Sequence, residues 1–189
     1  MKNKLRFDEI TDDGRLWAVC YEEDRNVLDQ IYQDWSDITF LEAFFEENRD
    51  DLAAFFKITD VDKAIYDTIQ DDRYLECLIL DIRPDTDLDR FFRPLNNLQR
   101  SEKVLSKEKA KGIAISSHPS WLRLYAIRFG PGCYLITGGT IKLTRTMEER
   151  KHTLAELTKM EKVRNYLLDN GVCDFDGFVE LNTEYEDND

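Results

Sequence analysis

The sequence predicts a soluble α+β protein that begins with a β-hairpin and helices and ends with an antiparallel sheet, a second hairpin and a terminal helix. Segments rich in aromatic and β-branched residues flank glycine-containing turns near both ends of the chain, which is typical of hairpins. Apolar residues repeat at helical spacing between these segments. Hydrophobic residues make up 42% of the 189 residues, so the chain can bury a core.

Strands open the N-terminal part of the chain, and helices follow them. Residues 4–10 and 15–21 are strand-like, and a turn that contains glycine separates them, so we expect a hairpin. Three helical patterns follow, at residues 39–56, 61–82 and 88–95. Thr39 and Glu42 fit a capping box at the start of the first pattern, which would be one long or broken helix. Pro84 requires the second helix to end just before it.

The C-terminal part of the sequence predicts a second sheet and a terminal helix. The polar, lysine-rich residues 99–112 are typical of an exposed connector, and residues 121–129 are strand-like. Two equal strand-like segments flank Gly138 and Gly139, which predicts a two-residue hairpin at the glycine pair. The remaining elements are expected at residues 133–137 and 140–144 (strands), at residues 153–170 (a helix with a capping box at Thr153) and at residues 178–181 (an edge strand).

Charge divides the chain into three parts. Residues 1–96 contain 12 basic and 25 acidic side chains, residues 97–168 contain 14 and 6, and residues 169–189 contain none and 8. We therefore expect an acidic N-terminal lobe at residues 1–96, a basic hairpin–helix module at residues 97–171 and an acidic tail at residues 172–189. Such asymmetry favours a charged partner, and the alternative is that the acidic parts neutralise the basic module within the fold.

Several classes of protein do not fit the sequence. No apolar run is long enough to cross a membrane, and no secretory signal follows the start, so we expect a cytoplasmic protein without a membrane partner. The four cysteines are widely spaced, as is typical of reduced thiols. Asp85, Asp87 and Asp89 have the opening spacing of a calcium loop, but Arg90 and Asn96 occupy the positions of the required Gly and Glu. We therefore expect no metal and no cofactor.

The candidate chemistry lies in the basic module, where cations accompany Tyr125. The cations are Arg123, Arg128, Lys142, Arg145, Arg150, Lys151 and His152. If the strands pair in sequence order, these groups converge on one rim of the sheet, where Arg and Lys would bind phosphate and His would transfer a proton. Tyr125 could stack on a base. Strand alternation separates Arg123 from Arg128 unless a bulge intervenes, and the alternative is a scatter of surface cations paired with the acidic lobe.

The same segment resembles the RelE/ParE/HigB toxin superfamily over about residues 120–168. The shared pattern is a strand with an aromatic residue and an arginine, then a hairpin, a basic segment and a helix. It falls on residues 124–129, 133–143 and 150–156. The resemblance implies a RelE-like module and, for the RNase-type members, metal-independent cleavage of messenger RNA on the ribosome, whereas ParE-type members poison gyrase. Glu148 and Glu149 replace the paired lysines that are common in the family.

The resemblance implies roles for individual residues. Arg128 matches the family's strand arginine, and Arg150, Lys151 and His152 match the basic residues before the terminal helix. We therefore predict a toxin of a toxin–antitoxin system that acts on RNA or the ribosome, with His152, Arg150 and Arg128 as catalytic residues of an endoribonuclease. The residues predicted to bind RNA are Arg123, Tyr125, Lys142, Arg145 and Lys151. The alternative is a non-enzymatic interaction module with a degenerate toxin-like fold, and both hypotheses allow an antitoxin or another protein as partner.

Overall fold

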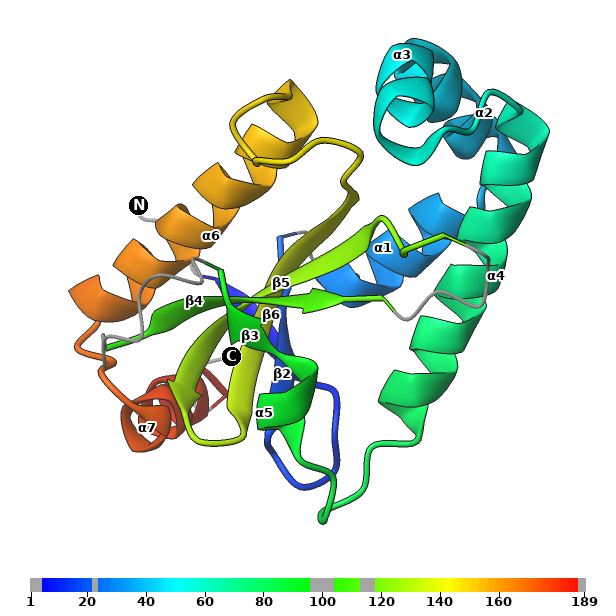
Figure 1. Ribbon diagram of the computed structural model, residues 1–189. Helices are drawn as coiled ribbons and strands as arrows, with labels where there is room; N and C mark the ends of the chain where they lie inside the picture. Colours follow the sequence, from blue (N-terminus) through cyan, green and yellow to red (C-terminus); the bar gives the residue numbers. More distant parts are fainter. Residues whose placement is uncertain (1–4, 22–23, 96–103, 113–117, 187–189) are drawn as a thin grey trace.

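The chain folds into one mixed sheet with helices on both faces (Figure 1). The computed structural model describes residues 5–21, 24–95, 104–112 and 118–186. Its strands are β1 (Arg6–Glu9), β2 (Leu16–Cys20), β3 (Arg93–Pro94), β4 (Ser106–Lys111), β5 (Leu122–Gly130) and β6 (Cys133–Ile141). The helical elements are α1 (Val27–Ser36), α2 (Ile38–Glu47), α3 (Arg49–Asp51), the π-helical turn η1 (Leu52–Phe56), α4 (Val61–Leu80), α5 (Leu88–Phe91), α6 (Lys151–Asp169) and α7 (Phe175–Glu186).

The six strands lie in the order β1-β2-β6-β5-β4-β3. Neighbouring strands are antiparallel except β2 and β6, which are parallel. This architecture confirms the predicted α+β class. None of the helices in the described ranges is both long and apolar enough to cross a bilayer.

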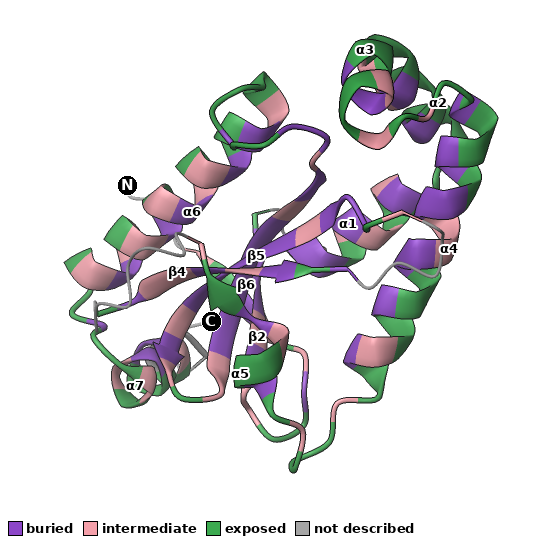
Figure 2. Cartoon of the chain, viewed as in Figure 1, coloured by how far each residue is buried: buried purple, intermediate pink, exposed green. Residues whose placement is uncertain are grey.

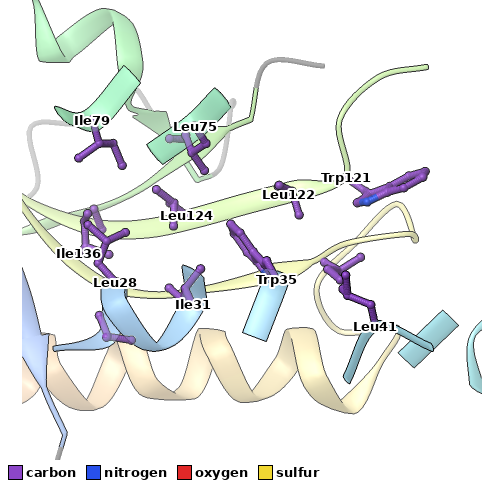
Figure 3. Packing of buried hydrophobic residues seen from close by; sticks show 14 of the residues in the cluster. Leu28, Ile31, Trp35, Leu41, Leu75, Ile79, Trp121, Leu122, Leu124 and Ile136 are labelled. Carbon is purple, nitrogen blue, oxygen red and sulfur yellow. The ribbon is translucent and has the colours of Figure 1, made fainter. Parts of the chain in front are cut away.

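Two hydrophobic cores lie on opposite faces of the sheet. The first joins helices α1, α2, α4 and α5 to alternate residues of the strands, and Figure 3 shows Leu28, Ile31 and Trp35 of α1 packed against β5 and β6. The second lies under α6 and α7. Strand β5 contributes side chains to both cores, because successive side chains of a strand point to opposite faces. Figure 2 shows that most of β5 and β6 is buried. The face under α6 and α7 is called the α6 face below.

The N-terminal hairpin and the broken helix are confirmed, but one helix was not foreseen. Strands β1 and β2 pair as expected. Helix α1 starts after Asn26, whose side chain accepts hydrogen bonds from two backbone N–H groups of the first turn. Helix α2 begins earlier than predicted, because Asp37 rather than Thr39 provides the cap. The predicted helix over residues 61–82 is confirmed as α4.

The predicted hairpin at Gly138 and Gly139 is wrong. Strand β6 runs through both glycines without a turn, and the reversal lies at Pro131 and Gly132, between β5 and β6. Gly132 has a φ of 70°, a conformation that glycine adopts without strain. A glycine pair between strand-like segments therefore marked the interior of one strand.

Strand β6 contains a β-bulge at Thr137. Tyr125 of β5 pairs with Gly138, and the next residue, Ala126, pairs with Ile136, so Thr137 is an extra residue on β6. The bulge reverses the alternation of side chains along the strand. As a result, apolar residues on both sides of the bulge face the first core: Tyr134, Ile136, Ile141 and Leu143.

Three further predictions need correction. The predicted connector contains strand β4, and the part at residues 99–103 lies outside the described residues. The predicted edge strand at residues 178–181 belongs to helix α7, because Phe178 and Leu181 are spaced for one helix face and pack into the second core. Thr153 does not cap α6: its hydroxyl donates to the carbonyl oxygens of Met147 and Arg150.

The three segments defined by charge all contribute to the cores that cover the sheet. Strand β2 of the acidic segment pairs directly with β6 of the basic segment. Helix α7 of the acidic tail covers the α6 face together with α6. The predicted domain boundaries at residues 96 and 171 stay a prediction.

Candidate anion-binding site

Arg128, the strand arginine of the toxin resemblance, is held by a carboxylate of the N-terminal segment. Its Nε and Nη2 atoms lie 3.3 and 3.2 Å from Oδ1 of Asp89. The same oxygen accepts from the Gly132 backbone N–H at 3.1 Å and from the Tyr134 hydroxyl at 2.5 Å. Burial alone would raise the pKa of Asp89, but these donors lower it overall. Arg128 therefore helps to fix α5 to the β5–β6 turn.

Arg150 is held in the same way at the other end of the sheet. Its Nε lies 2.7 Å from Oδ2 of Asp51 and its Nη2 lies 2.6 Å from Oδ1, a bidentate pair. Asp51 is buried, and Arg150 forms a salt bridge with it. The two other cations of this region, Arg145 and Lys151, are exposed.

His152 is half-buried beside the apolar core. Its Nε2 lies 3.1 Å from the carbonyl oxygen of Ile141, and its ring meets the ring of Phe44 edge-on at 5.1 Å. Burial lowers the pKa of His152. The ring is therefore neutral near pH 7 and faces a carbonyl oxygen and an aromatic ring.

The predicted catalytic residues do not lie together. In the β5–β6 ladder, Arg128 is opposite Tyr134, whereas Leu122, at the other end of the strand, is opposite Ile141, the residue that His152 contacts. Arg128 thus lies at one end of this ladder, and His152 and Arg150 lie at the other. Alternation also places Arg128 on the face opposite Arg123, as the sequence indicated.

Two of the predicted RNA-binding cations, Arg123 and Lys142, do come together, and two lysines of the expected connector join them. Lys109 and Lys111 lie on β4, Arg123 on β5, and Lys142 directly after β6. Lys111 pairs with Arg123 across the ladder, and Tyr125, the next residue on the Arg123 side of β5, belongs to the second core. Lys109, Lys111, Arg123 and Lys142 are called the cationic cluster below; it lies on the α6 face.

Within the described residues, none of the four cations forms an ion pair. Lys109 Nζ donates to the Leu95 carbonyl at 3.0 Å. Lys142 Nζ donates to two loop carbonyls at 2.5 and 2.6 Å, and Arg123 Nη1 donates to two carbonyls at 2.8 and 2.7 Å. Carbonyl oxygens satisfy the N–H groups without forming a salt bridge. The carboxylates of Glu148 and Glu149 lie close enough to Lys142 to oppose the lowering of its pKa. By contrast Lys107, which lies two residues before Lys109 on the same side of β4, forms an ion pair with Glu161 at 2.7 Å.

The cations of the cluster destabilise one another's charged forms. Burial, and after it the positive charge of Arg123, lower the pKa values of Lys109, Lys111 and Lys142. Burial also lowers the pKa of Arg123. Partly buried cations that repel one another are stabilised by any anion that binds among them. The cationic cluster is therefore the candidate anion-binding site.

Tyr125 lies at this site but is not exposed. Only 1% of its surface is accessible, and its ring belongs to the second core. The ring thus presents no face on which a base could stack in this structure. Its neighbour across the ladder on β4 is Lys109 of the cationic cluster.

Comparison with known proteins gives no relative: no protein-family model matches the chain, and neither a curated protein nor a solved structure matches it. The resemblance to RelE-type toxins therefore stays a prediction. Among the described residues, no three His, Cys, Asp or Glu side chains are grouped so that they could hold a metal ion.

Proposed function

We propose that the protein is an RNA-directed, toxin-like protein that binds the RNA backbone through the cationic cluster. The observation that carries the proposal is the set of four cations without carboxylate partners in the described structure, in a chain whose net charge is −13. An acidic chain repels polyanions, so binding of RNA requires a local cluster of positive charge. Neighbouring strands are about 5 Å apart and alternate residues about 7 Å apart, so the cluster can reach more than one phosphate.

The geometry favours binding over cleavage by the residues that the resemblance suggested. Phosphodiester cleavage needs a proton carrier and a charged group within reach of one phosphate. His152 and Arg128 lie at opposite ends of the β5–β6 ladder, and Arg128 is occupied by Asp89. Cleavage stays part of the toxin hypothesis and is tested separately from binding, by following RNA integrity with ribosomes present.

The binding test uses purified full-length protein and a fluorescent single-stranded RNA oligomer, with affinity followed by anisotropy over a range of salt. Lys109→Gln and Arg123→Gln should each weaken binding about 3- to 10-fold and reduce the salt slope by about 0.7 for each phosphate that the variant no longer binds. Lys107→Gln is the matched control, because it removes the same charge from the same side of β4 but from an ion pair with Glu161. Equal weakening in all three variants, or no binding by the wild type, would refute the proposal.

A second candidate function, a non-enzymatic protein-interaction module, is favoured by one observation. Both arginines that the family would use for phosphate are occupied by carboxylates of residues 1–96, Arg128 by Asp89 and Arg150 by Asp51. A toxin-like module whose arginines are paired with its own carboxylates can keep the fold and lose the ability to bind and cleave phosphodiesters. This alternative requires a stable protein complex and intact RNA; measurable RNA cleavage by the isolated protein would exclude it.

A further inference from the structure

Gly138 of β6 leaves room for a buried carboxylate. Glu156 of α6 is 8% exposed and lies against this glycine. A Cβ atom at Gly138 would overlap with Oε2 of Glu156, so only glycine accommodates the carboxylate in this position. The motif that the sequence assigned to a turn thus lets a charged group approach the strand backbone.

Tyr125 lies opposite Gly138, the residue against which this carboxylate packs, and next to the cationic cluster. It pairs with Gly138 across the β5–β6 ladder and with Lys109 across the β4–β5 ladder. Burial raises the pKa of Tyr125, the positive charge of Arg123 opposes the rise, and the negative charge of Glu156 adds to it. The hydroxyl group is therefore close enough to respond to both charges.

Two atoms of this pair have unused hydrogen-bonding capacity. Oε1 of Glu156 lies 2.5 Å from Lys159 Nζ. Oε2 of Glu156 and the Tyr125 hydroxyl, both buried, have no hydrogen-bond partner of good geometry in the described part of the chain, and the Gly139 backbone N–H is the polar group near the Glu156 carboxylate on the strand. Buried polar atoms are nearly always hydrogen-bonded, so each of these two atoms requires a further partner, such as ordered water or a ligand group.

The donors and acceptors define that group. Burial raises the pKa of Glu156, and the Lys159 ammonium group and the Gly139 backbone N–H oppose the rise. In its ionised form a carboxylate oxygen can only accept, whereas a tyrosine hydroxyl can donate. One hydroxyl group meets both needs, because it accepts from Tyr125 and donates to Glu156. In RNA the 2′-hydroxyl has this dual character, and it is the group that distinguishes RNA from DNA.

We propose that Glu156 and Tyr125 recognise a ribose 2′-hydroxyl of RNA held on the cationic cluster, and so select RNA over DNA. The inference rests on the proposed function, because the cluster must first bind the phosphates. Both atoms are buried in this structure, so entry of the ribose requires the side chains that cover them to move.

The experiment compares RNA with DNA of the same sequence, with deoxyuridine in place of thymidine, by anisotropy on the full-length protein. The wild type should bind RNA about ten-fold more tightly than DNA, as for a hydrogen bond to a charged group. Tyr125→Phe should reduce the preference to about two-fold or less, because it weakens RNA binding more than DNA binding. Tyr66→Phe is the matched control, since it removes an exposed hydroxyl from α4, on the opposite face of the sheet.

Thermal melting separates recognition from folding. Tyr125→Phe removes a hydroxyl that has no partner among the described residues, so its melting temperature should equal that of the wild type or exceed it. Glu156→Gln, which keeps the shape but not the charge, should also abolish the preference for RNA. Equal wild-type affinity for RNA and DNA, or a preference that survives in both variants, overturns this inference alone. Failure of the wild type to bind either nucleic acid overturns the proposed function as well.

Discussion

Asp72 carries the sharpest prediction for the stability of the protein. It is 2% exposed on α4, close to Tyr32 of α1, and its Oδ1 has no hydrogen-bond partner in the described residues. Burial raises the pKa of Asp72 to about 7 from the ordinary 3.8, the charge of Glu76 adds to the rise, and Arg73 opposes it. The folded protein therefore holds a proton on Asp72 that the unfolded chain releases near pH 4.

The sign and size of the effect follow from this difference. Between pH 3.8 and about 7 the folded state binds more protons at Asp72 than the unfolded state, so the free energy of unfolding falls as pH rises. Each pKa unit corresponds to about 1.4 kcal/mol, which gives a decrease of about 4 kcal/mol that is complete above pH 7. Stability from this group is fully present below pH 3.8.

The assay is urea unfolding of the wild type and Asp72→Asn at pH 5 and pH 8. The variant cannot ionise, so it should be about 2–4 kcal/mol more stable than the wild type at pH 8, and only about 1–2 kcal/mol more stable at pH 5. Asp62→Asn, at an exposed position of the same helix, is the control for removal of a carboxylate. A stability difference between wild type and Asp72→Asn that does not change with pH would refute the reasoning.

Three further outcomes are expected. Asp51→Asn should lower the melting temperature by a few degrees, since it breaks the bidentate pair with Arg150; an unchanged melting curve would show that the pair contributes nothing. Gly138→Ala should destabilise the fold by about 1–3 kcal/mol, and a double-mutant cycle with Glu156→Ala should recover most of that stability, whereas additive effects would contradict a steric conflict between the two side chains. Expression of the wild type should arrest growth, and a Lys109→Gln, Arg123→Gln variant should relieve the arrest while Lys107→Gln does not; relief by all of these changes would disconnect toxicity from the cationic cluster.

Local patterns were enough to find much of the fold. The N-terminal hairpin and α4 have strong periodicity and clear ends, and the structure confirms both. Strand β4 was missed because one of its sides is lysine-rich and the other includes Glu108, so it lacks a run of apolar residues. The glycine pair was misassigned because turns and strand interiors use the same residue, and the side chains that require it, Glu156 at Gly138 and Ile31 at Gly139, lie in other elements.

The candidate site was only partly accessible to sequence reasoning. Arg123 and Lys142 were found from composition and strand alternation. Arg128 and Arg150 looked equivalent to them, but their carboxylate partners lie 39 and 99 residues away along the chain. Sequence alone does not reveal which cations are neutralised across such distances, and this pairing decides which of them remain available to a ligand.

The parallel pairing of β2 with β6 makes the basic segment depend on the acidic one. Strand β6 lies inside the sheet only because β2 covers one of its edges. A fragment that starts at residue 97 would present the backbone of β6 as a bare edge, open to pairing with other chains. We therefore expect that removing the acidic segment yields an aggregating fragment instead of an unmasked toxin.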